Sequence, residues 1–280
     1  MNESSRALPP NPAARIPVLM YHQIGVPGAC GEARYTVSPR SFAQQMEALA
    51  ADGYQACSLS DFLDWHAGKD GLPAKTLLIT FDDGFCGVHD EALPVLRSLG
   101  WPCTVFIVTD RRGKVADWLV GSGAAGRGCT LMNDEELGTL LAAGAAVESH
   151  TATHCDLGRL DDARLADELE RSRTALQALT GKPARALAYP SGRHDERVIG
   201  CARRAGYEAA FSVDPGFNRP AQLPMALRRL DVYGSDSAAA LLRKVRLGSN
   251  DGSLSHGARY LLRRARSRLQ SFFGPPVQRA

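Results

Sequence analysis

Two adjacent carboxylates, Asp82 and Asp83, stand directly after an apolar run and directly before Gly84. The run, Thr76–Phe81, has the composition of a strand buried on both faces, as parallel strands are. Burying a carboxylate is costly unless a partner or a metal compensates its charge, so packing does not explain the pair. A turn at Gly84 can bring both side chains to one rim, where one could bind a cation and the other could act as a base.

Two histidines, His150 and His154, lie four residues apart further along the chain. At helical spacing both imidazoles lie on one face and can share a metal ion. With Asp83 they form a three-ligand set of nitrogen and oxygen donors, which leaves one position open for water, as in catalytic zinc sites. We therefore expect a divalent metal on these three residues, with Zn²⁺ as the favoured ion.

The two stretches read T-F-D-D-G and H-T-A-T-H. In this order they match two motifs, T-F-D-D-G and H-[ST]-x-x-H, and the chain resembles the polysaccharide deacetylase family (carbohydrate esterase family 4, the NodB-homology domain) over roughly residues 17–233. The resemblance implies a distorted (β/α)7 barrel. It also implies a metal-dependent hydrolase that removes N-acetyl groups from an N-acetylated sugar in a polysaccharide, an oligosaccharide or a glycolipid precursor, with Asp82 as the general base.

The first apolar run ends in V-L-M-Y-H, which is similar to the opening strand of one branch of this family. In that branch the histidine lies at the active site and replaces a late general-acid histidine. The resemblance therefore gives this role to His22, because the late L-x-I-x-H motif is absent here. The alternative is that His22 has no catalytic role and is a structural histidine at the rim or in the core, with its hydrogen bonds satisfied by the protein.

The third family motif, R-x-P-Y-G, is altered in this chain. Ala188 stands at the arginine position and Ser191 at the tyrosine position, whose backbone N–H faces the oxyanion in the family. A backbone donor survives substitution, so Ser191 can keep that role. Arg229, in R-L-D-V, is our candidate to replace the missing arginine and orient Asp82; the alternative is a surface arginine on an edge strand.

Three further side chains are candidates for contact with the sugar. Tyr189 and Pro190 belong to the altered third motif, and Trp118 lies in the Gly-rich stretch 109–131, which we expect to form a loop at the site rim. Trp118 could stack on a pyranose face or could merely anchor that loop.

Apolar strand-like runs and amphipathic helix-like runs alternate along the chain with short connections, which predicts parallel strands joined by crossover helices. The candidate residues follow strand ends, where barrel active sites lie. We expect a disordered leader at 1–14, one catalytic domain at 15–247 and a basic amphipathic tail at 248–280. Ser60 should cap a short helix in which His66 is a surface residue.

Positive charge is concentrated at the C-terminus. Residues 241–280 contain nine Lys or Arg and one acid, a net +8, so the remaining residues sum to −5 of the total +3. An acidic body argues against nucleic-acid binding. A helix over 258–273 could lie on an anionic membrane surface or could pack on the barrel as a solvated helix. The sequence leaves the oligomeric state open.

Seven cysteines occur without a CxxC pair, which favours reduced thiols and a cytoplasmic protein. Met1–Arg15 lacks the apolar core of a secretory signal, and no run is long enough to span a membrane. We therefore expect a cytoplasmic location, with peripheral contact to the inner face of the membrane as an option.

Two other functions fit the same residues. One is a metal-dependent hydrolase of a non-sugar amide on the same barrel. The other is a non-catalytic carbohydrate-binding protein, which the altered motifs would allow. The presence of Asp82 argues against a pure binding protein, since binding alone does not need a base.

Overall fold

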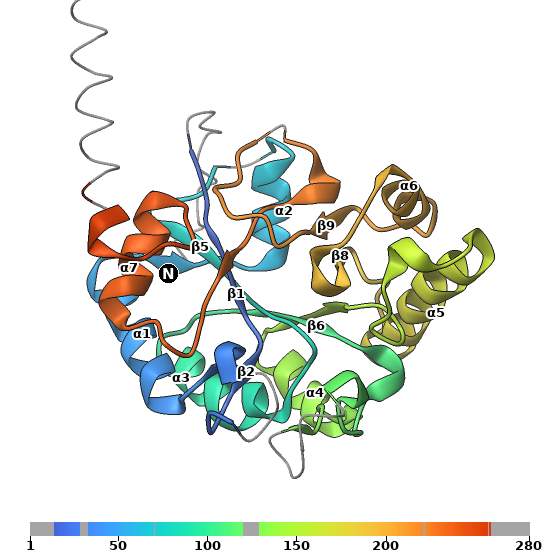
Figure 1. The fold of residues 1–280 in the computed structure, drawn as a ribbon, viewed down its shortest axis with the longest axis horizontal. Helices are drawn as coiled ribbons and strands as arrows, with labels where there is room; N and C mark the ends of the chain where they lie inside the picture. The colour runs from blue at the N-terminus through green and yellow to red at the C-terminus, as the bar shows by residue number, and fades with distance from the viewer. Residues whose placement is uncertain are drawn as a thin grey trace, which may run out of the picture.

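A curled parallel β-sheet forms the centre of the protein in the computed structural model, which describes residues 14–28, 33–69, 71–119, 129–220, 222–256 and 258 (Figure 1). The strand order is β10-β1-β5-β6-β7-β8-β9, with β4 paired to β5. The strands are β1 (Val18–Tyr21), β4 (Gln55–Ala56), β5 (Thr76–Phe81), β6 (Thr104–Ile107), β7 (Ala146–Ser149), β8 (Ala186–Ala188), β9 (Ala209–Phe211) and β10 (Leu230–Asp231). A parallel bridge between Phe211 and Leu227 connects β9 to the segment that enters β10, so the sheet curls into a barrel.

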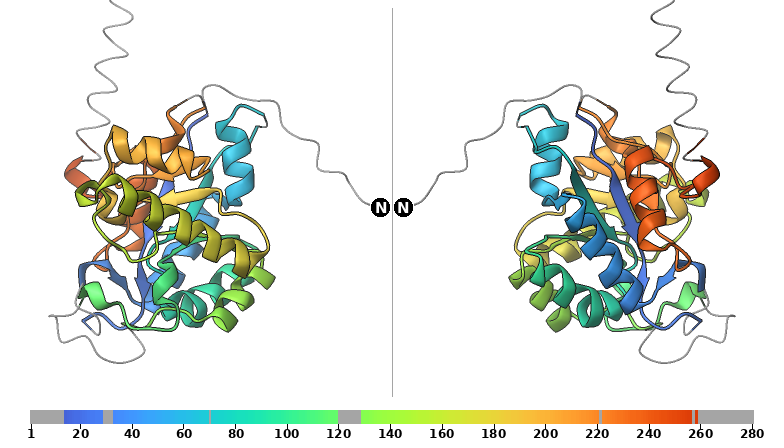
Figure 2. Two further views of the ribbon diagram at one scale, coloured as in Figure 1. Left: turned by 90° about the vertical axis from the view of Figure 1, so that its right-hand side faces the viewer. Right: turned by 90° about the vertical axis from the view of Figure 1, so that its left-hand side faces the viewer.

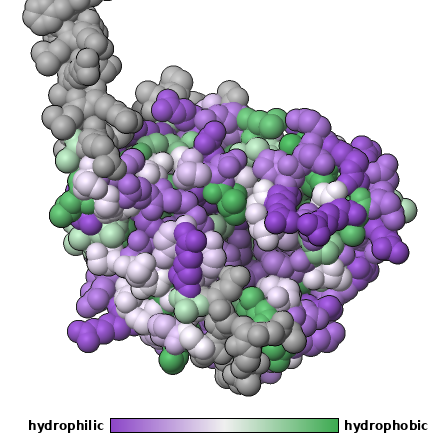
Figure 3. Space-filling model, viewed as in Figure 1, coloured by the Kyte–Doolittle hydropathy of each residue, from purple (hydrophilic) through white to green (hydrophobic). Residues whose placement is uncertain are grey.

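Helices surround the sheet on its outer side (Figures 1 and 2). They are α1 (Pro39–Ala51), α2 (Leu59–His66), α3 (Leu93–Ser98), α4 (Asp134–Ala142), α5 (Asp162–Thr180), α6 (Glu196–Arg204) and α7 (Ala238–Leu247). A separate two-stranded sheet joins β2 (Gln23–Ile24) to β3 (Thr36–Val37). The predicted distorted (β/α)7 barrel is confirmed. The face seen in Figure 3 is largely hydrophilic, with small separate apolar areas.

Strand alternation divides the core into two parts. On β5, Leu77, Ile79 and Phe81 belong to the outer core beneath the helices. Leu78 belongs to a second cluster inside the barrel. Thr80, of the same parity, is also fully buried. Every second residue along a strand therefore faces the barrel interior, as Leu78 and Thr80 do. This alternation, the inward parity of the strand, decides which side chains reach the site.

Helix α2 closes the amino end of the barrel. Its Phe62 and Trp65 are buried in the interior cluster. The Phe62 ring lies 6.1 Å from that of Phe211, which in turn lies 5.3 Å from that of Phe106. Aromatic contacts of this kind fill the amino half of the barrel interior and leave the carboxyl half for polar groups.

Polar side chains cap the first turn of six of these helices, α3 being the exception. Ser38 and Asn133 cap α1 and α4, and Asn133 forms a full capping box. The short helix α2, however, is capped by Ser58 and not by Ser60. Its last residue, His66, is only 6% exposed, so the prediction of a surface residue is wrong. The ring turns inward because α2 packs across the barrel end rather than along its side.

The helix that follows β5 begins as a π-helix, Val88–Ala92, and continues as α3. Gly87 precedes it, and a Cβ there would lie 1.8 Å from the Ile24 carbonyl oxygen. Only glycine permits this approach of the helix to β2, which keeps the chain after His22 close to the chain after Asp83.

The C-terminal helix α7 packs on α1 and carries a buried cation. Lys244 pairs with Asp236 and donates to the Asp231 carbonyl oxygen at 3.0 Å. Beyond the helix, Asn250 accepts from the Asp231 N–H at 2.9 Å, and Gly252 accepts from Arg243 at 2.6 Å. The first residues of the predicted tail are therefore attached to the barrel.

Both predicted terminal segments lie mainly outside the described residues. The leader lies there up to residue 13, and the basic tail lies there from residue 259. Its membrane contact thus stays a prediction. Among the described residues, no helix has both the length and the apolar character needed to cross a membrane.

The expectation that all cysteines are reduced thiols is not met at one described position. Cys129 is disulfide-bonded. Five others are free: Cys57, Cys86, Cys103, Cys155 and Cys201. Disulfides persist mainly in oxidising compartments, so cysteine chemistry does not support the predicted cytoplasmic location.

Replacing Lys244 with Met should lower the free energy of unfolding by about 3–5 kcal/mol, because the Asp236 carboxylate would stay buried without its cation. Urea denaturation would measure the loss. Lys69→Met is the matched control, since Lys69 pairs with Asp64 on the surface and its loss should cost less than about 1 kcal/mol. Equal losses in the two variants would contradict a stabilising role for the buried pair.

Candidate active site

Four predicted residues meet inside the carboxyl end of the barrel. His22, Asp82 and His150 each follow directly on β1, β5 and β7, in positions that continue the inward parity of those strands. Arg229 precedes β10 and is also inward. The sequence separates these residues widely, and the curled sheet brings them to one end.

The three expected metal ligands lie together. Asp83 Oδ1 is 3.5 Å from His150 Nε2 and 3.3 Å from His154 Nε2. One ligand atom from each residue lies within 4.8 Å of the others. Burial lowers the pKa of both histidines, that of His154 to about 3, which favours the neutral imidazole that binds metals. The donor set fits a divalent ion.

The histidine pair does not lie on a helix, and this corrects the geometric argument from spacing. His150 follows β7 and His154 lies in the loop beyond it. Thr151 and His154 have positive φ values of 69° and 65°, so the chain turns back on itself. The Thr151 hydroxyl accepts from the His154 N–H at 3.1 Å and holds this turn. Both imidazoles reach one point because of the loop.

Each of these two histidines contacts a further group of the protein. His150 Nδ1 lies 2.8 Å from the Ala188 carbonyl oxygen, so this nitrogen carries the proton and Nε2 keeps its lone pair toward Asp83. The Trp118 ring stacks on His154, with centroids 4.4 Å apart at 20°. Trp118 was predicted either to bind sugar or to anchor the rim loop, and one of its faces covers a metal-site histidine.

The turn after β5 places the two carboxylates on the same rim. Asp83 has a φ of 69°, and Gly84 has a φ of 89° with its N–H bonded to the Asp82 carbonyl oxygen at 2.8 Å. A Cβ at Gly84 would lie 2.9 Å from Ile107 Cγ2, so glycine is required for two reasons. A regular strand would have pointed Asp83 away from Asp82.

Arg229 holds Asp82 through two charge-assisted hydrogen bonds. Its terminal nitrogens donate to the two carboxylate oxygens at 2.6 and 2.8 Å. The guanidinium is completely buried, and Nε donates to the Ser212 carbonyl oxygen at 2.9 Å. Burial raises the pKa of Asp82, but the charge of Arg229, followed by those of His150 and His22, outweighs it and lowers the pKa to about 2.

His22 lies beside this carboxylate. Burial lowers the pKa of His22 to about 4, although the charge of Asp82 opposes the shift, so the ring is neutral at pH 7. The Tyr35 ring packs against it with centroids 4.6 Å apart. Both rings line a small cavity that Asp83 also borders. Sequence reasoning missed Tyr35; the signal was an aromatic residue in the loop that follows a candidate catalytic strand.

The altered third motif forms a tight turn after β8. Ser191 is exposed and has a φ of 54° within the 3₁₀ turn Pro190–Gly192. Tyr189 is completely buried, and its hydroxyl donates to the Met225 carbonyl oxygen at 3.0 Å. Pro190 is buried as well. Both side chains pack against protein in this structure, and substrate contact by Tyr189 and Pro190 stays a prediction.

Arg229→Met should lower the free energy of unfolding by about 3–5 kcal/mol, because it leaves the Asp82 charge buried without a partner. The double variant Asp82→Asn, Arg229→Met removes both charges and should recover much of that loss. Urea denaturation of the wild type, both single variants and the double variant completes the cycle. An absence of coupling between the two positions would show that the ion pair does not contribute to folding.

Comparisons with known proteins point to one family. Residues 69–210 match the family model of polysaccharide deacetylases. The Bacillus subtilis protein YxkH, named as a polysaccharide deacetylase, is 26% identical over 228 residues, which are 81% of this chain and 75% of that protein. The poly-β-1,6-N-acetyl-D-glucosamine N-deacetylase of Staphylococcus epidermidis is 24% identical over 188 residues, and the match spans only 62% of that relative and 64% of this chain.

Solved structures share the fold. The Streptococcus pyogenes deacetylase PplD, in complex with acetate, matches with a TM-score of 0.72 and 24% identity over 83% of this chain and 98% of that chain. IcaB from Ammonifex degensii matches with a TM-score of 0.70 and 24% identity over 87% of this chain and 99% of that chain. At these identities the likeness concerns the barrel itself.

Proposed function

The chain belongs to the polysaccharide deacetylase family and is an N-deacetylase, and we propose that it is a zinc-dependent hydrolase that removes the acetyl group from an N-acetylated sugar. The substrate we propose is a polysaccharide, an oligosaccharide or a glycolipid precursor. The observation that carries the proposal is the placement of an arginine-bound carboxylate, Asp82, directly beside a three-ligand metal site.

Asp83, His150 and His154 would hold the metal ion. When bound there, a divalent ion lowers the pKa of a water molecule and polarises the amide carbonyl group. The proton on His150 Nδ1, directed to the Ala188 carbonyl oxygen, fixes the ring orientation that such a ligand needs.

Asp82 is the proposed general base. Its two hydrogen bonds to Arg229 fix the carboxylate plane and keep it ionised. It takes the proton of the water that attacks the acetamide carbonyl carbon. Arg229 is a positioning residue, since it acts through Asp82.

His22 and Ser191 are the remaining proposed groups. His22 delivers a proton to the leaving nitrogen as the carbon–nitrogen bond breaks. Because burial keeps its ring neutral at pH 7 in the free protein, His22 must first take up a proton, and the charge of Asp82 favours that uptake. The backbone N–H of Ser191 donates to the oxyanion, and the left-handed turn at this residue is the proposed reason that it can face the site. The products are acetate and a free amino sugar.

Acetate release by the purified protein should require zinc and should fall by about 10²–10⁴-fold in Asp82→Asn. The assay uses N-acetylglucosamine oligomers with β-1,4 and β-1,6 linkages, nucleotide sugars and lipid-linked sugars, with and without a chelator. Bound zinc should be unchanged in Asp82→Asn, because Asp82 is not a proposed ligand. The matched control is Asp162→Asn, which alters an exposed carboxylate and should keep full activity.

Retained turnover in Asp82→Asn would overturn the base assignment. No release from any sugar, with zinc bound, would favour a non-sugar amide substrate or a non-catalytic binding protein.

His22→Ala should also reduce turnover by about 10²–10⁴-fold and leave zinc content unchanged. The reason is that His22 supplies a proton to the leaving group and does not belong to the ligand set. The test is to measure both the zinc content and the turnover rate of the purified variant. Loss of zinc in this variant would make His22 a ligand instead of the acid.

A further inference from the structure

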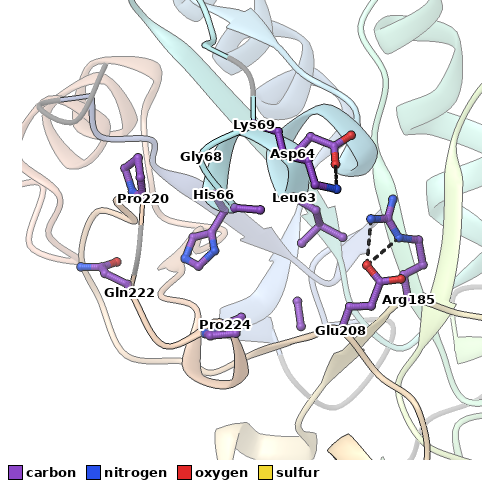
Figure 4. A pocket seen from close by; sticks show the side chains of 12 residues that line it. Leu63, Asp64, His66, Gly68, Lys69, Arg185, Glu208, Pro220, Gln222 and Pro224 are labelled. Atoms are coloured by element: carbon purple, nitrogen blue, oxygen red, sulfur yellow. Dashed lines mark hydrogen bonds and ion pairs between the residues drawn. The ribbon is translucent and has the colours of Figure 1, made fainter. Parts of the chain in front are cut away.

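A cavity of about 370 Å³ opens at the amino end of the barrel, opposite the site described above. It lies between α2 and the loop before β10 (Figure 4). Arg185 and Glu208 on its wall directly precede β8 and β9, whereas Ser191 and His150 follow the ends of strands. The volume lies in the range of small-molecule sites. Nothing in the proposed deacetylation uses this cavity.

The charges at the cavity wall cancel in pairs. Arg185 binds Glu208 at 2.8 Å, and Lys69 binds Asp64 at 2.9 Å, as Figure 4 shows. The wall therefore carries no net charge, but it offers both hydrogen-bond donors and acceptors. Such a surface discriminates against a charged ligand and favours a neutral one with several polar groups.

One polar group at the cavity lacks a partner. The His66 ring lies between α2 and the loop that carries Gln222 (Figure 4), and its Nε2 is buried with no hydrogen bond among the residues that the structure describes. Burial lowers the pKa of His66, so the ring is neutral at pH 7. A buried nitrogen without a partner is unfavourable, and a ligand that bonds to it would remove that cost.

Apolar side chains supply the rest of the wall. Leu63 and Ala209 come from the barrel end, and Pro220 and Pro224 come from the facing loop. A ligand for this cavity needs an apolar ring face for these groups and hydroxyl or amide groups for the polar rim. The pyranose ring of a neutral sugar has both features.

We propose that this cavity is a second carbohydrate site, which binds one residue of a neutral saccharide chain away from the metal centre. His66 and Gln222 provide hydrogen bonds, and the two ion pairs bind hydroxyl groups at the rim. This proposal rests on the proposed function in one respect: we take the bound saccharide chain to be the polymer that the enzyme deacetylates. Its effect would be to hold long substrates on the enzyme.

The test is binding of N-acetylglucosamine hexamers, β-1,4- and β-1,6-linked, measured by NMR and calorimetry on full-length Asp82→Asn, in which turnover does not interfere. Imidazole resonances of His66 should shift on titration. Ala67→Trp should weaken this binding about tenfold, or ~1.4 kcal/mol, because Ala67 is exposed at the cavity mouth and the indole would fill it. His66→Phe keeps the ring shape, removes the nitrogens and should have a similar effect.

Ala143→Trp is the matched control. Ala143 directly follows α4 as Ala67 directly follows α2, and it borders a different cavity, so binding should be unchanged. In the active enzyme, Ala67→Trp should raise KM for a long polymer several-fold without changing kcat for a dimer.

Three results would overturn the proposal: no shift of His66 with any hexamer, equal binding in Ala67→Trp and wild type, or a shift with inorganic phosphate instead of sugar. A failure of deacetylation is separate, since it appears as missing acetate release and leaves the His66 shift untouched.

Discussion

The buried ion pair between Arg229 and Asp82 is the constraint on which the site depends. A guanidinium with no exposed surface is tolerated only because a carboxylate and the Ser212 carbonyl oxygen satisfy it. The pair joins the segment before β10 to the end of β5, and these two strands lie on either side of β1 in the sheet, so it forms only when strands far apart in sequence have paired. Folding and the orientation of the proposed base are therefore one event.

The barrel interior is divided between two tasks by position along the strands. At the amino end, α2 and the rings of Phe106 and Phe211 fill the interior with apolar contacts. The same two rings lie 5.7 and 6.0 Å from the Arg229 guanidinium, so the apolar half also supports the cation above it. Polar groups collect at the carboxyl end, where connections are loops and can take any shape.

Unusual backbone conformations are concentrated where the chemistry is placed. Among the described residues, the non-glycine positions with positive φ are Lys75, Asp83, Thr151, His154 and Ser191, and all but the first belong to the site or its loops. Such conformations cost about 1–3 kcal/mol each and persist only when the surroundings fix them. Here the strands β5, β7 and β8, each of which ends shortly before one of these loops, supply that restraint.

The sequence by itself determined the fold class, and it singled out Asp82, Asp83, His150, His154, His22 and Arg229 as candidate site residues, because strand alternation and short motifs are local properties of the chain. It erred where side-chain direction depends on distant packing: His66 turns inward because α2 closes the barrel. The meeting of the two histidines was expected from helical spacing but arises from a loop. Only the tertiary structure decided these points, because direction at a loop or a helix end is set by contacts between segments far apart in sequence, and no local pattern records those contacts.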